Sequence, residues 1–120
     1  MAPAPFPRAA RLLTAGDFAR LRGISQRISG RHFNAEVAAA PTPGARLGLA
    51  VSRRVSKRAV RRNRIKRIAR DSFRHARDRL PAVDILLIAR QGADSGDNGA
   101  LRLDLARLWE RIVAVHGGGR

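Results

Sequence analysis

The acidic and histidine side chains are the residues that could perform chemistry in this chain, because the sequence contains no cysteine. The nine carboxylates are scattered along 120 residues, and none pairs with a second acid and a histidine as acid–base catalysis would need. His32 and Glu36 come closest, since they would share one face of a strand, but two ligands are too few for a two-metal nuclease. Asp94 and Asp97 lie in a glycine-rich loop, where solvation explains them better than a bound cation. We therefore expect no catalytic residue and no metal site in the protein itself.

Positive charge is the dominant chemical feature of the sequence. The chain holds 25 Lys and Arg against 9 Asp and Glu, a net charge of +16. A compact domain tolerates such self-repulsion when a polyanion binds it. Lys57 and Lys66 are the only lysines, and the guanidinium of arginine suits both phosphate and base stacking. Nucleic acid is favoured over a membrane surface, because the only tryptophan, Trp109, lies far along the chain from the basic cluster.

The basic residues concentrate in segment 53–79, which carries 13 Lys and Arg but only two acids. Its apolar residues recur at helical spacing and predict a core-facing stripe on a long helix that runs to about Arg79. Arg61 and Arg62 fall inside this apolar arc. Either the helix is irregular there, or these side chains turn out of the core, and such a local violation is typical of a functional site. The stripe consists of Ile65, Ile68, Ala69, Ser72, Phe73, Ala76 and Leu80.

Periodicity and turn signals predict an α-β-β-β-α-β-α order, an α+β fold with helices on one small sheet. The strand at 46–52 alternates bulky residues with Gly48, Ala50 and Ser52, so one of its faces is nearly bare. The strand at 83–89 holds an unbroken apolar run and is predicted to be buried on both faces. The other predicted elements are a helix ending at residue 23, strands at 24–28 and 32–39, and a final helix from about residue 101, after a polar loop at 91–99.

The organisation predicted is a flexible N-terminal segment at 1–10, a single nucleic-acid-binding domain at 11–115 and a glycine-rich tail at 116–120. The hydrophobic fraction of 44% is sufficient for a core. No run approaches 18 apolar residues, and the first residues lack the apolar core of a secretory signal. A soluble, intracellular protein is therefore expected.

Residues 59–70, Ala-Val-Arg-Arg-Asn-Arg-Ile-Lys-Arg-Ile-Ala-Arg, resemble the Arg-Asn-Arg motif of the bacterial ribonuclease P protein subunit. Segments 46–54 and 84–90 match the strands of that family in order and spacing, and Asp17-Phe18 fits its first helix. The resemblance extends from about Arg11 to Trp109. It implies an α-β sandwich related to a ribosomal-protein domain, with a left-handed crossover through the long helix, although most β-α-β crossovers are right-handed.

This resemblance also implies a function. In the family, a catalytic RNA cleaves precursor tRNA with Mg²⁺, and the protein binds that RNA and the 5′ leader. The protein would bind no cofactor itself and act in the bacterial cytoplasm as a monomer in a 1:1 complex with RNA. The alternative is a ribosomal or chaperone-type RNA-binding module of the same fold, while the missing acid cluster disfavours a protein-only nuclease. The implied RNA-binding residues are Arg53, Arg54, Lys57, Arg61, Arg62, Asn63, Arg64, Lys66, Arg67 and Arg70.

The family's leader cleft lies between the first helix and one sheet face. Arg22 and Glu36 stand where many relatives carry aromatic residues, so Phe18 is the one aromatic left to stack on a base, since the parity of Phe33 places it in the core. We therefore expect more electrostatic leader binding, and we hypothesise that Arg22 and Glu36 pair across the cleft. The implied cleft residues are Phe18, Arg22, Asn34, Glu36, Ala50 and Ser52.

Overall fold

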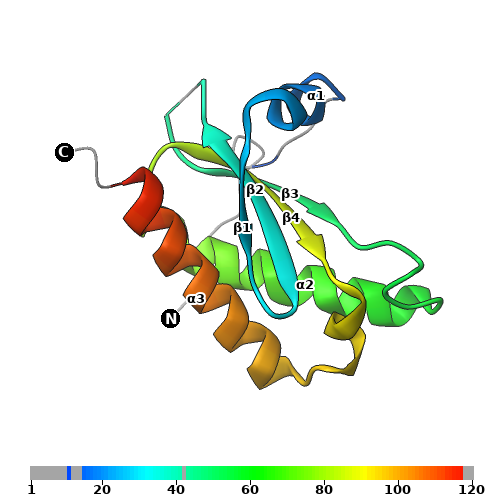
Figure 1. Cartoon of the computed structure of the whole chain (residues 1–120). Coiled ribbons are helices and arrows are strands. Elements are labelled where there is room, and N and C mark those ends of the chain that lie inside the picture. The colour runs from blue at the N-terminus through cyan, green and yellow to red at the C-terminus, as the bar shows by residue number, and fades with distance from the viewer. Residues whose placement is uncertain (1–10, 12–14, 42, 118–120) are drawn as a thin grey trace.

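The computed structural model describes residues 11, 15–41 and 43–117. Its helices and strands follow the predicted α-β-β-β-α-β-α order (Figure 1). None of the helices it describes combines the length and apolar character needed to cross a membrane. The elements are α1 (Ala15–Ile24), β1 (Gln26–Ser29), β2 (Phe33–Ala39), β3 (Arg46–Ala50), α2 (Ala59–Ala76), the 3₁₀ turn η2 (Arg77–Arg79), β4 (Val83–Ala89), the 3₁₀ turn η3 (Gln91–Ser95) and α3 (Asn98–His116).

The four strands form one sheet in the order β1-β2-β4-β3. β2 runs antiparallel to both β1 and β4, whereas β3 runs parallel to β4. Parallel neighbours need a crossover connection, and α2 supplies it. The predicted crossover through the long helix is therefore confirmed, while its left hand stays a prediction. α2 and α3 cover one face of the sheet, and α1 packs on the other face at one end (Figure 1).

The core lies between the sheet and the two long helices. Trp109 and Phe73 join α3 to α2 through an edge-on ring contact with centroids 5.9 Å apart, and the indole Nε1 of Trp109 donates to Ser72 Oγ at 2.8 Å. Phe33 is a core residue as predicted, with 1% of its surface exposed. This packing turns the basic side of α2 away from the sheet. The buried α2 residues are Ile65, Ile68, Ala69, Phe73 and Ala76, all members of the predicted stripe.

Several boundaries differ from the predictions. α2 ends at Ala76 and continues as η2 to Arg79. Helical geometry stops at Leu80, which is extended (φ −81°, ψ 142°), because the residue before a proline avoids the helical region. Ile24 ends α1 rather than beginning a strand. α3 begins at residue 98 and includes His116, the first residue of the predicted tail, while residues 1–10 and 118–120 lie outside the described part.

The burial predicted for β4 is only half correct. Ile85 and Leu87 are fully buried against the helices. Leu86 and Ile88, which point to the opposite face, are half-buried, because α1 covers only part of that face. An apolar run alone does not separate a strand covered on both faces from a strand with one partly open face.

Asp84 fixes α1 against the sheet through a buried charge network. Its side chain has no exposed surface, and it accepts two hydrogen bonds from Arg46, at 2.7 Å from Nε and 2.6 Å from Nη2. Arg20 of α1 also pairs with Asp84 and donates to the Ala39 carbonyl. The hydrogen bonds that Arg46 donates to Asp84 raise the pKa of Arg46, which further contacts Asp17. The network therefore ties one end of α1 to β3 and β4.

Candidate RNA-binding surfaces

The outward side of α2 carries basic side chains without intramolecular partners. Arg67, Arg70 and Asn63 are exposed, and Lys66 is half-buried. Arg53, Arg54 and Lys57 lie exposed in the preceding connection. Within the described part of the chain, none of these side chains forms a hydrogen bond or ion pair. Their donors are available to phosphate, the usual partner of such a face. We call this set of residues the basic helix surface.

The other three arginines of the predicted set are bonded within the protein. Arg61 Nε donates to Asp94 Oδ1 at 2.6 Å, and Arg61 Nη2 donates to the Asp94 carbonyl at 3.0 Å. Arg62 Nη1 donates to the Ser56 carbonyl at 2.9 Å. Arg64 bonds to Asn98 Oδ1 at 2.7 Å and to the carbonyls of Asp94 and Gly96. These arginines hold both loops that flank the start of α2.

These bonds resolve the conflict that the helical wheel raised. α2 is regular from Ala59, and its Arg61 and Arg62 side chains are half-buried rather than pointing into the core. Each turns toward a loop that offers an acceptor. The second of the two sequence-based alternatives is therefore correct.

Three of the predicted leader residues, Asn34, Glu36 and Ala50, lie on the sheet face that carries α1, while Phe18 lies on α1 and Ser52 follows the end of β3. Asn34, Ile88 and Ala50 are aligned across β2, β4 and β3 in the ladder, so their side chains share this face. Phe18 packs with Leu21, Ala38 and Leu86 where α1 meets the sheet. Ala50 and Ser52 are exposed, whereas Gly48 is buried, so the bare strip is shorter than predicted. We call Phe18, Asn34, Glu36, Ala50 and Ser52 the open sheet face; the Arg22 side chain lies outside the described residues.

Glu36 already has partners from its own sheet. Its Oε1 accepts from Ser25 Oγ at 2.7 Å, and its Oε2 accepts from Arg27 Nε at 2.5 Å. These bonds, led by that from Ser25, hold the pKa of Glu36 below its usual value. Arg27 faces Glu36 directly across the β1–β2 ladder. Glu36 therefore forms its ion pair with Arg27. The hypothesised pair with Arg22 stays a prediction.

The acidic residues considered for chemistry have structural partners. Asp94 binds Arg61, and Asp97 caps α3 by accepting from the Ala100 N–H at 2.8 Å, so both loop acids have partners within the protein as well as contact with solvent. His32 lies just before β2, where its backbone N–H donates to Asp104 Oδ2 at 2.8 Å, and its ring is not hydrogen-bonded to Glu36, whose described partners are Ser25 and Arg27. In the described ranges, no three His, Asp or Glu side chains gather as a metal site would require. Asp104 and Asp84 were missed by sequence reasoning, although an acid inside an apolar run already calls for a buried partner.

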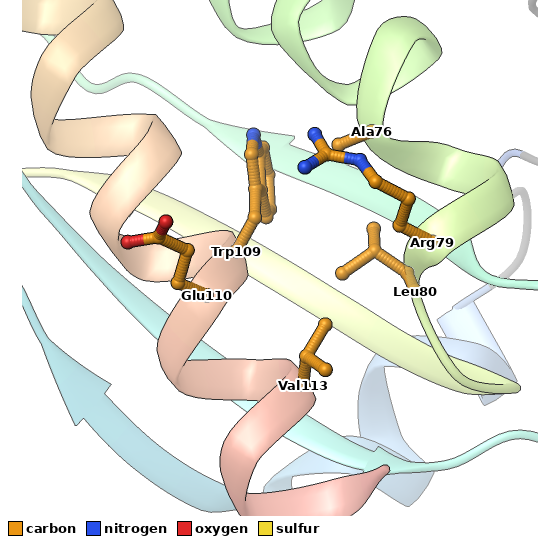
Figure 2. Close-up of a pocket in the computed structure, with 6 residues that line it drawn as sticks. All are labelled: Ala76, Arg79, Leu80, Trp109, Glu110 and Val113. Carbon is orange, nitrogen blue, oxygen red and sulfur yellow. The ribbon is translucent and has the colours of Figure 1, made fainter.

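The described surface includes two hollows beside α2. One, of about 220 Å³, lies between the end of α2 and α3, where Trp109 and Arg79 form opposite walls (Figure 2). It contains one carboxylate, Glu110, and no histidine, so it offers no acid–base pair. The other, more open hollow of about 380 Å³ lies beside the start of α2 and is lined by Ser56, Lys57, Arg58, Arg61 and Asp94.

Fold and surfaces together define a class of protein, a small basic α+β domain that binds RNA. The family model described as ribonuclease P matches residues 6–113. The ribonuclease P protein component of Chromohalobacter salexigens is 41% identical over 108 residues, covering 89% of this chain and 84% of that protein. The corresponding component of Legionella pneumophila (strain Lens) is 38% identical over 112 residues, covering 93% and 96%.

Solved structures agree with the sequence comparison. The ribonuclease P protein of Staphylococcus aureus superposes with a TM-score of 0.79 at 28% identity, covering 90% of this chain and 95% of that one. The Thermotoga maritima protein gives a TM-score of 0.76 at 28% identity, covering 85% and 96%. The chain therefore belongs to the family of bacterial ribonuclease P protein components, and its role is in tRNA 5′ processing as part of an endoribonuclease. The family resemblance is confirmed, and a ribosomal or chaperone module is not favoured.

Proposed function

We propose that this protein binds the ribonuclease P RNA through the basic helix surface and the 5′ leader of precursor tRNA through the open sheet face. The observation that carries the proposal is the separation of the two surfaces. α2 packs on one face of the sheet, and α1, with Phe18, packs on the other (Figure 1). A single chain of this shape can therefore contact two RNA segments at once. We propose a monomer in a 1:1 complex with the RNA, acting in the bacterial cytoplasm.

The protein's part in the reaction is to bind and orient RNA. Unpartnered arginines supply phosphate contacts, which fix register and affinity rather than read bases. The described acids that sequence reasoning considered are engaged by arginine or backbone N–H groups, so they do not fit a resident Mg²⁺. We therefore assign the Mg²⁺ that supports cleavage to the RNA of the holoenzyme. Binding the leader opposite the catalytic RNA would hold the precursor in position for the cleavage.

Leader binding on the open sheet face combines one aromatic residue with polar groups. Phe18 can stack on a base, an interaction worth about 1–3 kcal/mol. Asn34 is half-buried on this face, and its side-chain amide carries both donor and acceptor groups for a nucleobase edge. Arg27 lies on the same face, but Glu36 offsets its charge. The face therefore provides shape, stacking and hydrogen bonds more than net charge.

Reconstitution tests the proposal. Purified protein is added to ribonuclease P RNA and precursor tRNA at a Mg²⁺ concentration too low for the RNA alone. We expect site-specific leader removal, and tighter binding of precursor than of mature tRNA. Binding without rescued cleavage would indicate a module of another role, and cleavage without the RNA would indicate a protein-only nuclease.

A further inference from the structure

The connection from β4 to α3, residues 90–97, is anchored at two points beside the start of α2, and we call it the clip loop. Ala93 is completely buried and anchors η3 to the core. Asp97 fixes the other end of the loop by capping α3. Between these anchors, Asp94 presents its carboxylate to Arg61 and its carbonyl to both Arg61 and Arg64. The loop therefore positions two arginines of segment 59–70, Arg61 and Arg64.

The bonds to the clip loop leave part of each guanidinium unused. A guanidinium has five N–H donors. Arg61 uses its Nε and one N–H of Nη2, so the Nη1 group and the second N–H of Nη2 remain. This remaining edge is a two-donor fork of the kind that binds phosphate bidentately. The Arg61 side chain is 42% exposed, so a ligand can reach it.

Arg61 also borders the open hollow beside α2, whose other lining residues include two more cations. Lys57 and Arg58 lie there with Ser56, and Asp94 is the only acid. The hollow has a net positive lining, because three cations face one acid and that acid is already bonded to Arg61 Nε. Such a lining suits an RNA phosphate group. A guanidinium already fixed in one rotamer loses less conformational freedom when it binds.

We propose that Asp94 is a positioning residue for RNA binding, which orients Arg61 so that its unused edge takes a backbone phosphate of the ribonuclease P RNA at this hollow. The proposal rests on the proposed function. Its rival is that Asp94 competes with phosphate for Arg61 and so weakens RNA binding. The two ideas predict opposite signs when the carboxylate is removed, because a positioning residue helps binding and a competitor hinders it.

Four test variants and one control variant of the full chain separate these ideas, with affinity for ribonuclease P RNA measured over a range of salt concentrations. Asp94→Ala removes the carboxylate and its bond to Arg61. Asp94→Asn removes the charge but keeps an oxygen that can accept from Arg61 Nε. Arg61→Ala removes the positioned group, and the double variant tests whether Asp94 acts through it. Asp97→Ser is the matched control, since it removes a carboxylate from the same loop while serine still caps α3.

We expect Asp94→Ala to weaken binding about tenfold, as the loss of one charge-assisted contact does. The slope of log K against log[salt] should also become shallower by about one, which a purely structural loss would not cause. Asp94→Asn and Asp97→Ser should stay close to the parent protein, and Asp94→Ala should have no further effect once Arg61 is alanine. Tighter binding by Asp94→Ala, or an equal loss in the Arg61→Ala background, would overturn the proposal.

A second comparison applies if Asp94→Ala does not fold, as thermal unfolding would reveal. Arg61→Lys keeps the charge but cannot form both bonds to Asp94 together. The proposal expects Arg61→Lys to bind RNA almost as weakly as Arg61→Ala, and parent-like binding by Arg61→Lys would contradict it. A parent protein that fails to bind ribonuclease P RNA would refute the proposed function, whereas a binding parent with unaffected variants would refute only the role of Asp94.

Discussion

Two groups of arginines in this protein have the same side chain and opposite tasks. Arg20 and Arg46 surround the buried Asp84 and fix α1 to the sheet. Arg67 and Arg70 stand exposed on α2 with no partner in the described part of the chain. The difference lies in the neighbours and not in the arginines, because acids are placed beside the first group and kept away from the second. For these two groups, the position of the acids therefore decides the task of the arginine.

This division has an energetic consequence. A buried ion pair contributes little net stability while it is intact, but removing one partner leaves an uncompensated buried charge. Unpartnered surface arginines repel one another, so the basic helix surface lowers stability in the isolated protein. The first group should therefore be sensitive in folding experiments, and the second in RNA-binding experiments.

Removal of Asp84 should have the largest effect. Asp84→Ala removes the shared acid of Arg46 and Arg20 and leaves the longer contact of Arg46 with Asp17, so we expect the free energy of unfolding to fall by about 3–5 kcal/mol. Urea denaturation followed by circular dichroism measures this loss. Arg67→Ala is the control, and its free energy of unfolding should stay within about 0.5 kcal/mol of the parent value. Equal losses in both variants would break the distinction between the two groups.

The affinities for two different RNA ligands provide the second test. Arg67→Ala should weaken binding to ribonuclease P RNA about threefold to tenfold while leaving an isolated single-stranded leader bound, because one phosphate contact is lost. Phe18→Ala should do the reverse, since it removes stacking from the open sheet face. Filter binding with each RNA separately measures both affinities. Loss of both ligands in both variants would mean that the two surfaces are one.

Salt dependence sharpens the same comparison. If the basic helix surface meets about five to eight phosphates, the slope of log K against log[salt] should be about −4 to −7 for the ribonuclease P RNA. We expect a shallower slope for the isolated leader, because Glu36 offsets Arg27 on the open sheet face. Titrations at several KCl concentrations measure both slopes. A slope near zero for the ribonuclease P RNA, with affinity retained, would exclude the basic cluster as the binding surface.

Much of this arrangement follows from local sequence patterns. The helical spacing from Ile65 to Ala76 fixes which side of α2 is buried, and alternation in β2 and β3 fixes which residues face α1. The basic cluster and the Arg-Asn-Arg segment then locate the RNA-binding face. These patterns involve residues that are close together in the chain, so they can be recognised from the sequence alone.

The partners of charged residues could not be read in the same way. Asp94 lies 33 residues from Arg61, and Asp84 lies 64 from Arg20, so these contacts exist only once the strands have been ordered. Glu36 illustrates the problem, because helix spacing suggested Arg22 as its partner, while the β1–β2 register supplies Arg27. Sequence patterns give the face on which a side chain lies, and the strand register decides what it meets there.

The smallest expected effect concerns Glu36, which joins the two halves of the comparison because it is an acid on an RNA-binding face. Hydrogen bonds from Ser25 and Arg27 lower its pKa, so its contribution to stability is present above the usual value of 4.5 and is lost as the pH falls through the lower folded-state value. The Arg27 side chain is 57% exposed, so the pair is worth only about 0–1 kcal/mol, and Glu36→Gln should fold almost normally.

The effect of Glu36→Gln should instead appear in leader binding. Removal of the carboxylate frees Arg27 for phosphate and lowers repulsion, so the affinity for a single-stranded leader should rise about twofold to threefold at low salt. Glu110→Gln is the control for net charge, because it removes one carboxylate from α3, which covers the opposite face of the sheet (Figure 1). Fluorescence anisotropy with a labelled leader measures both variants. An equal gain in affinity for both variants would mean that net charge alone causes the effect. Weaker leader binding by Glu36→Gln would mean that Glu36 holds Arg27 in position for the leader, as Asp94 is proposed to hold Arg61 for the ribonuclease P RNA.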